Sequence, residues 1–418
     1  MTTSVLVVIA LFVVLLVLKL PIYIAILIPA VYLQVFVNNM SPSNIIVGMY
    51  EAIARQGLLA VPFFMFAGSI MSNTSLGKRL TDFFDILFRP FRAGLALGCL
   101  GSNAFFGAIS GSAAATTATF LGIAHKPLKE RYDEKLATGL IVSSSAISAI
   151  LPPSIGMIVF AMAAEISIAG LFLTGIMPSL LLVVVITIYL SLRYRKRERR
   201  AFPKASEVLK SFIKALPVLI LPVIMFGGIY SGFFTPTEAA AVSVAYALVA
   251  GIFLLRDIGL KKLLKILKEA AVISSQVFII VAAGTVFAQA MTMAQFHVAI
   301  INVFANVDRV VFLLLLNLFL LFFGSFLDGV SKILILAPLA LPAAAALGID
   351  PFHIGIIFMI NIGISTFTPP FGLGIFVAQS ILDRSVGYIT RSIAPFLICY
   401  LTVLILVTFL PQIALFLI

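Results

Sequence analysis

The sequence predicts an all-α polytopic membrane protein built from two inverted-topology repeats, and three observations lead to this fold class. The 418 residues are 62% hydrophobic and 11% charged, with a mean hydropathy of +1.20, unlike a soluble domain. Apolar runs of about 17 to 25 residues, enough to cross a bilayer as a helix, recur from end to end. Two short motifs each occur only twice, and in both cases the copies are 217 residues apart: Phe-Phe-Gly begins at Phe105 and Phe322, and Pro-Pro at Pro152 and Pro369.

The first repeat, residues 1–200, begins with crossings expected near 6–18, 21–37 and 58–71, and with a charged, surface-lying segment around 45–55. The run 4–18 lacks a basic flank and a small-residue cleavage pattern, so we expect a retained helix and not a signal peptide.

Two unusual segments follow. Residues 93–124 are apolar but contain glycines and serines and have basic residues at both ends, which predicts a re-entrant hairpin. Residues 136–164 form a helix broken at Pro152 and Pro153, because paired prolines remove amide donors and disfavour helical geometry before them. A crossing over 168–192 completes the repeat.

The second repeat, residues 201–418, follows the same plan. Its expected crossings are 212–233, 235–255 and 270–291, with an amphipathic segment at 261–268. A second hairpin at about 310–347 and a helix over 354–381, broken at Pro369 and Pro370, precede a last crossing from residue 388 onward.

Charge placement supports the inversion. Each half makes five crossings when the hairpins are not counted, and an odd number inverts the second half. The densest basic run, RYRKRERR at 193–200, places the loop 193–210 in the cytoplasm and both termini in the periplasm. Of the 28 Lys and Arg residues, only Arg55, Arg309 and Lys332 then lie off the cytoplasmic side. The basic excess therefore reflects membrane topology and does not indicate nucleic-acid binding.

The first hairpin tip is a candidate cation site. Ser110, Gly111 and Ser112 face the serine-rich stretch Ser143, Ser144, Ser145 and Ser148, and hard neutral oxygen donors suit Na⁺ better than a transition metal. The alternative is close helix packing, because Gly107 and Gly111 also form a GxxxG pair.

The second tip carries a carboxylate. Gly324, Ser325, Asp328, Gly329 and Ser331 face a polar stretch before Pro369; its members are Asn361, Ser365, Thr366 and Thr368. A carboxylate at membrane depth is costly and is by default functional. The alternative is an ion pair between Asp328 and Lys332, one helical turn apart. Few other ionisable residues lie at this depth, so Na⁺ coupling is favoured over H⁺ coupling.

The sequence gives no indication of an enzyme. It contains no nucleotide-binding loop, catalytic triad or HExxH motif. His125, His297 and His353 lack metal-ligand spacing, and Cys99 and Cys399 are isolated residues in apolar runs. We expect no organic cofactor and no transition metal, with Na⁺ as the only ion.

The paired FFG hairpins, GSAAATTATFLG and the broken helices ILPPSIGMIVFA and FTPPFGLGIFVA resemble the large membrane (M) subunit of tripartite ATP-independent periplasmic (TRAP) transporters over essentially the whole chain. The resemblance implies an elevator mechanism, with a mobile transport domain and a scaffold in the bacterial inner membrane. It implies two partners, a separate four-helix Q subunit and a periplasmic substrate-binding protein that delivers an organic acid of the C4-dicarboxylate or sialic acid type.

The resemblance also assigns site residues. One Na⁺ site falls at Ser110, Gly111 and Ser112 with Ser144, Ser145 and Ser148, and another at Gly324, Asp328 and Gly329 with Thr366 and Thr368. The substrate is expected between the tips, near Ser112, Ser154, Ser325, Asn361 and Ser365. The alternatives are a stand-alone Na⁺-coupled dicarboxylate or citrate symporter, and, from different classes, a channel or a membrane enzyme.

Overall fold

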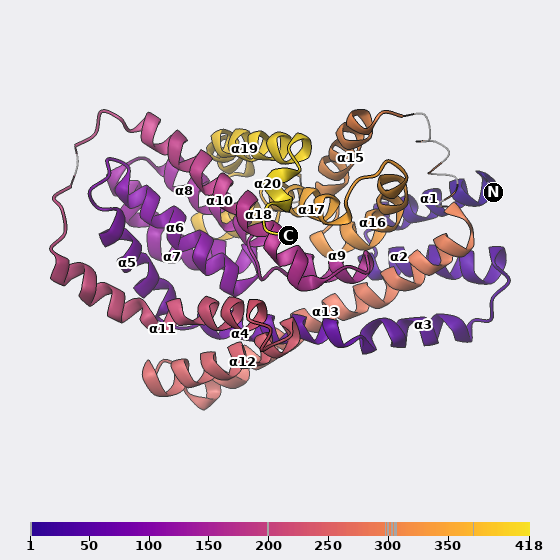
Figure 1. The fold of residues 1–418 in the computed structure, drawn as a ribbon, viewed down its shortest axis with the longest axis horizontal. Coiled ribbons are helices and arrows are strands. Elements are labelled where there is room, and N and C mark those ends of the chain that lie inside the picture. The colour runs from indigo at the N-terminus through magenta and orange to yellow at the C-terminus, as the bar shows by residue number, and fades with distance from the viewer. Residues whose placement is uncertain are drawn as a thin grey trace.

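The computed structural model describes residues 2–418, apart from 199, 297, 299, 300, 302, 303, 305, 306 and 371, so His297 lies outside the described residues. Every regular element in the described part of the chain is a helix, which confirms the all-α fold class. Figure 1 shows the helices packed in one elongated body, with the N-terminus at one end and the C-terminus near the middle.

Apart from α5, where a basic loop and no helix was expected, the helices of the first half follow the expected order. Their bounds are α1 Thr2–Val17, α2 Ile22–Tyr32, the π-helical turn Leu33–Val37, α3 Ser43–Ala54, the 3-10 turn Gln56–Leu59, α4 Ala60–Ser72, α5 Leu76–Phe88, α6 Gly94–Ser110, α7 Ala113–Arg131, α8 Glu134–Ser145, the 3-10 turn Ala146–Ala149, α9 Ile155–Ala163 and α10 Ile168–Arg193. The first hairpin is α6 and α7, and the first broken helix is α8 and α9.

The second half contains the same kinds of element. Their bounds are α11 Ala205–Tyr230, α12 Pro236–Val249, the π-helical turn Ala250–Leu254, α13 Leu260–Met293, α15 Arg309–Gly324, α16 Gly329–Ala346, α17 Pro351–Thr366, α18 Leu373–Leu382, α19 Val386–Phe409 and α20 Gln412–Leu415. The second hairpin is α15 and α16, and the second broken helix is α17 and α18.

Within the described residues, the helices long and apolar enough to cross a membrane are Ile168–Arg193, Ala205–Tyr230, Pro236–Leu254, Leu260–Met293, Gly329–Ala346 and Val386–Phe409. The pair Ser43–Ala54 and Gln56–Ser72 qualifies as one span with a bend of 56°. These findings agree with a multi-pass membrane protein.

Elements recur at the sequence offset of 217. The two π-helical turns, Leu33–Val37 and Ala250–Leu254, correspond residue for residue, and so do the cis peptide bonds Pro152–Pro153 and Pro369–Pro370. The boundary at residue 200 between two repeats stays a prediction.

One element differs from the expectation for the second half. The segment 261–268 and the crossing 270–291 form the single continuous helix α13. Its sequence between Leu260 and Ala270 contains neither Gly nor Pro, whereas Gly57 and Pro62 follow Arg55 at the bend of the first half. Arg55 itself is extended, with φ −63° and ψ 125°, and this ends α3.

The helices pack in two groups (Figure 1). In the first group α13 contacts α2, α3 and α4, and α12 contacts α4 and α11. In the second group the hairpins and broken helices contact one another and α10 and α19. The groups meet where α4 contacts α6 and where α13 contacts α16.

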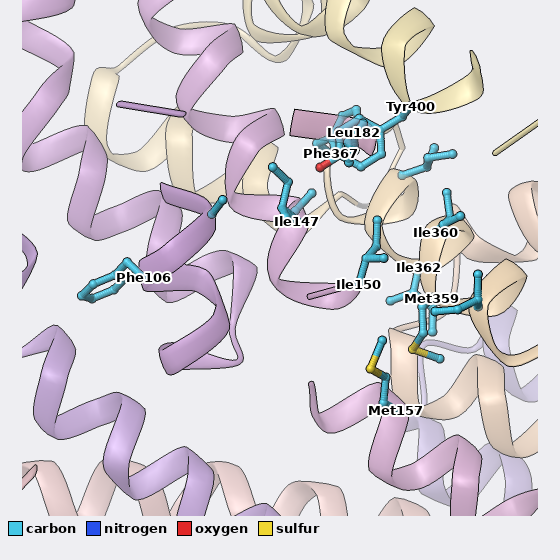
Figure 2. Packing of buried hydrophobic residues seen from close by; sticks show 14 of the residues in the cluster. Phe106, Ile147, Ile150, Met157, Leu182, Met359, Ile360, Ile362, Phe367 and Tyr400 are labelled. Carbon is cyan, nitrogen blue, oxygen red and sulfur yellow. The ribbon is translucent and has the colours of Figure 1, made fainter. Parts of the chain in front are cut away.

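The centre of the second group is apolar. The broken helices meet there: the main-chain carbonyl of Ala146 lies 3.2 Å, and the Ile150 side chain 3.6 Å, from a Cβ placed on Gly363. Figure 2 shows Ile147 and Ile150 on one side of this contact and Met359 and Ile360 on the other. All four side chains are fully buried, so the two breaks are held in a packed core.

Candidate cation and substrate site

The first hairpin tip is formed by the ends of two helices. α6 ends at Ser110 and is capped by Gly111, whose positive φ of 61° is favourable for glycine, and Ser112 caps α7 by accepting a hydrogen bond from the Ala115 amide. A Cβ placed on Gly111 lies 3.8 Å from the carbonyl oxygen of Pro153. The tip therefore faces the Pro-Pro break of its own half, as the sequence predicts.

Buried hydroxyls surround this tip. The Ser110 and Thr116 hydroxyls are 2.7 Å apart, and Thr116 also donates to the carbonyl of Ser112 at 2.9 Å. Ser110 is almost fully buried and Thr116 fully buried. These oxygens are the hard donors that an alkali cation prefers. Thr116 was not among the residues predicted from the sequence, because the second arm of the hairpin was interpreted there as apolar.

Ser144 and Ser145 meet α6 farther back, at Asn103. The Asn103 amide donates to the Ser144 hydroxyl at 2.6 Å, and Ser145 donates to the Asn103 carbonyl oxygen at 3.4 Å. Asn103 precedes Ser110 by two helical turns, or about 10 Å along the axis. The structure therefore does not bring all six residues of the expected first Na⁺ set into one coordination shell.

Ser148 lies between these two places. Its Cβ is 3.0 Å from a Cβ placed on Gly107, so Gly107 allows α6 to approach the turn before the break. Close helix packing, the alternative considered from the sequence, thus explains the glycine at position 107. It does not explain why the Ser110 and Thr116 hydroxyls lie together. The signal for Asn103 was available as one amide in an apolar run, but its partners depend on the packing of α6 against α8.

In the second tip the Asp328 carboxylate caps α16. It accepts hydrogen bonds from the Val330 amide at 3.0 Å, the Ser331 amide at 3.1 Å and the Ser331 hydroxyl at 2.5 Å. Among the described residues Asp328 forms no ion pair with Lys332, in contrast to the alternative considered from the sequence. Ser325 donates to the carbonyl of Leu321 at 3.1 Å, so its hydroxyl is engaged within α15.

The hydroxyls of the second broken helix are bonded to their own backbone. Thr366 donates to Gly363 at 2.7 Å, Thr368 to Ile364 at 3.0 Å, and Ser365 to Asn361 at 2.5 Å. Ser365 also accepts a hydrogen bond from the Lys332 ammonium. From the sequence, Lys332 was considered only as an ion-pair partner for Asp328, and its hydrogen bond to Ser365 was not predicted.

Asn361 connects the second broken helix to the second hairpin. Its amide donates to the Asn317 side chain at 2.8 Å, and Asn317 donates to Thr408 at 3.0 Å. The buried carbonyl oxygen of the Asn361 side chain has no hydrogen-bond partner. An unpaired buried acceptor is costly and suits a ligand that donates a hydrogen bond or carries a positive charge. Ser154, at the start of α9, is buried and makes no capping bond with its side chain.

A cavity of about 500 Å³ lies between the two groups of helices. It is lined by α13, α9 and α16 and by the end of α3, and includes Arg55, Glu165, Thr285, Gln289, Thr292 and Leu334. None of Ser112, Ser154, Ser325, Asn361 and Ser365 lines it. The predicted substrate residues and this cavity are therefore separate in the described conformation.

An ion-pair cluster joins the first broken helix to the first hairpin and to the end of the second broken helix. Arg384, after α18, pairs with Glu134 at the start of α8 at 2.9 Å, and Lys129 pairs with it at 2.8 Å. The hydrogen bonds from Arg384 and then Lys129 lower the pKa of the Glu134 carboxyl to about 2. Glu134 therefore stays ionised across the physiological pH range.

Residues 9–413 match the family described as the DctM component of tripartite ATP-independent periplasmic transporters. The C4-dicarboxylate TRAP transporter large permease DctM of Pseudomonas aeruginosa is 36% identical, covering 90% of this chain and 89% of that relative. The sialic acid TRAP transporter large permease SiaM of Vibrio cholerae is 34% identical, covering 88% of each chain. The YdaH transporter of Alcanivorax borkumensis has a similar fold, with a TM-score of 0.56 and 15% identity over 87% of this chain and 86% of that chain.

Proposed function

The chain belongs to the DctM component family of tripartite ATP-independent periplasmic transporters, and from this premise we propose that it imports a small organic acid using a Na⁺ gradient. It is a transporter permease subunit and not an enzyme. The observation that carries the Na⁺ proposal is the first tip, where Ser110, Thr116 and the carbonyl of Pro153 gather oxygens beside the end of α6.

The proposed substrate class is a C4-dicarboxylate or a sialic acid, as the names of the relatives suggest. The Arg55 guanidinium on the cavity wall is the chemical group that pairs best with a carboxylate. In this proposal the cavity is the route by which the acid reaches the tips. Substrate delivery would require a periplasmic binding protein and a small Q subunit as partners.

The proposed mechanism is an elevator, in which the hairpins and broken helices move past α4 and α13. Small residues at both contacts support this: a Cβ placed on Gly68 of α4 lies 2.7 Å from the Ser110 carbonyl, and one on Gly284 of α13 lies 2.6 Å from the Leu334 Cβ. Glycine at these positions lets the helices of the two groups approach closely without a side chain between them. The bacterial inner membrane and periplasmic termini belong to the same proposal.

The test is reconstitution of the chain with its Q subunit and binding protein in liposomes, followed by uptake of labelled dicarboxylates and sialic acids under an imposed Na⁺ gradient. We expect saturable uptake that requires both the binding protein and Na⁺. Uptake unaffected by replacing Na⁺ with choline would refute Na⁺ coupling. Uptake that persists without the binding protein would instead support the stand-alone symporter, and conduction without saturation would support a channel.

A further inference from the structure

Lys332 is an unusual residue for its position. It lies in the first turn of α16, one turn from the second hairpin tip, and its side chain is fully buried at 0% exposure. No other Lys, Arg, Asp or Glu among the described residues is buried. A charge at this depth is expensive unless the surrounding groups compensate for it.

The ammonium is held at the contact between the second hairpin and the second broken helix. Lys332 Nζ donates to the Ser365 hydroxyl at 2.5 Å, and Ser365 in turn donates to the carbonyl of Asn361. A Cβ placed on Gly324 would overlap both the Lys332 Nζ and the Ser365 Oγ. Glycine at position 324 is therefore what leaves room for the ammonium.

Two helices end beside this position. α15 ends at Gly324 and α17 ends at Thr366, directly after Ser365. The last carbonyls of a helix have no partner inside the helix and carry partial negative charge. The carboxylate of Asp328 lies one turn before Lys332 and adds to this negative potential. The Lys332 ammonium therefore occupies the kind of place where broken helices hold a free cation.

The first half has the same contact without the ammonium. The offset of 217 pairs Gly324 with Gly107 and Ser365 with Ser148, and Gly107 and Ser148 are also in contact. The position that corresponds to Lys332 is Ala115, which carries no charge. Instead, the first half places the Ser110 and Thr116 hydroxyls near its tip.

We infer that the Lys332 ammonium is a tethered cation that occupies the cation position of the second tip, so that Na⁺ exchanges only at the first tip. The inference refines the proposed Na⁺ coupling and rests on it for its consequence in transport. It replaces the Na⁺ ion expected from the resemblance at Gly324, Asp328, Gly329, Thr366 and Thr368. A covalently attached cation cannot be released on either side, so this position contributes no Na⁺ to the driving force.

The test measures the number of ²²Na⁺ ions bound per chain in the purified chain with its Q subunit, at saturating Na⁺. Lys332→Ala empties the position while Ser365 and the two helix ends remain, so we expect one more bound Na⁺ than in the wild type. Lys332→Met removes the charge but fills the volume, so we expect no additional Na⁺. Na⁺ should raise the melting temperature of Lys332→Ala more than that of the wild type, and choline should not.

An equal Na⁺ count in the folded wild type and Lys332→Ala would overturn the tethered cation. The proposed function fails separately: Na⁺ binding by Lys332→Ala but none by the wild type would refute Na⁺ coupling and support the tethered cation. If Lys332→Ala does not fold in any salt, the converse variant Ala115→Lys decides. It should bind one Na⁺ fewer than the wild type, and an unchanged count would overturn the inference.

Discussion

At the scale of single residues, Asn103 joins the first hairpin to its broken helix through buried hydrogen bonds. Replacing Asn103 with Leu keeps the approximate volume but removes the hydrogen bonds to Ser144, to Ser145 and to the main-chain carbonyl of Ile141. Both serines still donate to carbonyls of their own helix, so no buried hydroxyl is left unpaired. We expect a loss of about 2 kcal/mol in stability, from three bonds of roughly 0.6 kcal/mol each in a membrane protein.

The same variant should weaken Na⁺ binding, because Asn103 fixes α8 against the arm that carries Ser110. The measurement is the melting temperature and the apparent Na⁺ affinity in purified protein. Ser102→Ala is the matched control, since Ser102 bonds only to Gly98 within α6 at 2.6 Å. Unchanged Na⁺ affinity in a folded Asn103→Leu chain would contradict this role.

Arg55 offers a second test at this scale. Its guanidinium lines the cavity and donates to the carbonyl of Met162 at 3.5 Å, which leaves most of its donors free for a carboxylate. We expect Arg55→Ala to raise the KM for the transported acid by about tenfold or more, since a charged hydrogen bond contributes roughly 1.5–3 kcal/mol. Arg55→Lys should recover only part of this, because it lacks the planar pair of donors. An unchanged KM in both variants would remove Arg55 from the substrate route.

The sequence predicted the positions of hydroxyls and breaks well, but not which side chains pair. Ser110 and Ser112 lie at the tip as expected because a glycine and a capping serine determine the tip locally. Asn103 with Ser144, and Lys332 with Ser365, are contacts between distant segments. The spacing of residues within one segment carries no information on such pairs. The partner of an isolated Asn or Lys in an apolar run therefore could not be predicted.

At the scale of elements, the contact of α4 with α6 depends on Gly68. A Cβ at this position meets the Ser110 backbone at 2.7–3.0 Å, and backbone atoms cannot move aside as a flexible side chain can. We expect Gly68→Ala to destabilise the chain by about 1–3 kcal/mol through overpacking and to displace the first tip. Uptake should fall sharply, with weaker Na⁺ dependence, measured in liposomes.

Gly122→Ala is the matched control for this substitution. Gly122 lies in α7, and a Cβ there meets nothing within 4 Å. Alanine favours a helix over glycine by roughly 1 kcal/mol, so this variant should be as stable as the wild type or more so, with normal uptake. Equal uptake by the two variants would show that the close approach of α4 to Ser110 has no importance for transport.

The contact between the starts of α8 and α19 depends on Glu134 and should make stability depend on pH. Its pKa is lowered to about 2 from an ordinary value of 4.5, first by Arg384 and then by Lys129. A lowered carboxyl pKa adds stability that is complete above about 4.5 and is lost as pH falls through the folded value. Melting temperature should therefore fall between pH 5 and pH 2, and Glu134→Gln should flatten part of this fall.

Glu130→Gln is the control for the pH series, because it removes the same charge from an exposed side chain whose nearest cation, Lys126, is 4.0 Å away. It should follow the wild-type curve. A Glu134→Gln curve identical to that of Glu130→Gln would contradict a stabilising role for the contact with Arg384.

The broken helices and hairpins could be located from the sequence because prolines and glycines act locally. α13 was predicted as two elements, since a charged amphipathic segment followed by an apolar run is typical of two elements as well as of one. The helix is continuous because no Gly or Pro lies between Leu260 and Ala270. In the first half, Gly57 and Pro62 lie at the bend between the corresponding segments. The cavity was not predictable, because its wall joins α3, α9, α13 and α16 from both halves.

At the scale of the whole molecule, the proposed movement of the second group past the first can be stopped with one bond. A Cβ placed on Gly284 lies 2.6 Å from the Cβ of Leu334, and a disulfide needs a Cβ separation of roughly 3.5–4.5 Å, which a small shift of α16 provides. The pair Gly284→Cys and Leu334→Cys therefore joins α13 to the second hairpin. Cys99 and Cys399 are buried and free, and can remain.

We expect oxidation of the double variant in liposomes to abolish uptake and a reductant to restore it. An elevator requires α16 to leave α13, and a covalent link between them prevents this in both directions. Each single cysteine variant is the control and should be unaffected by oxidant. Binding of Na⁺ at the first tip should survive the crosslink, because Ser110 and Thr116 lie within the second group of helices. Full uptake by the crosslinked chain would mean that transport proceeds without relative movement at this contact.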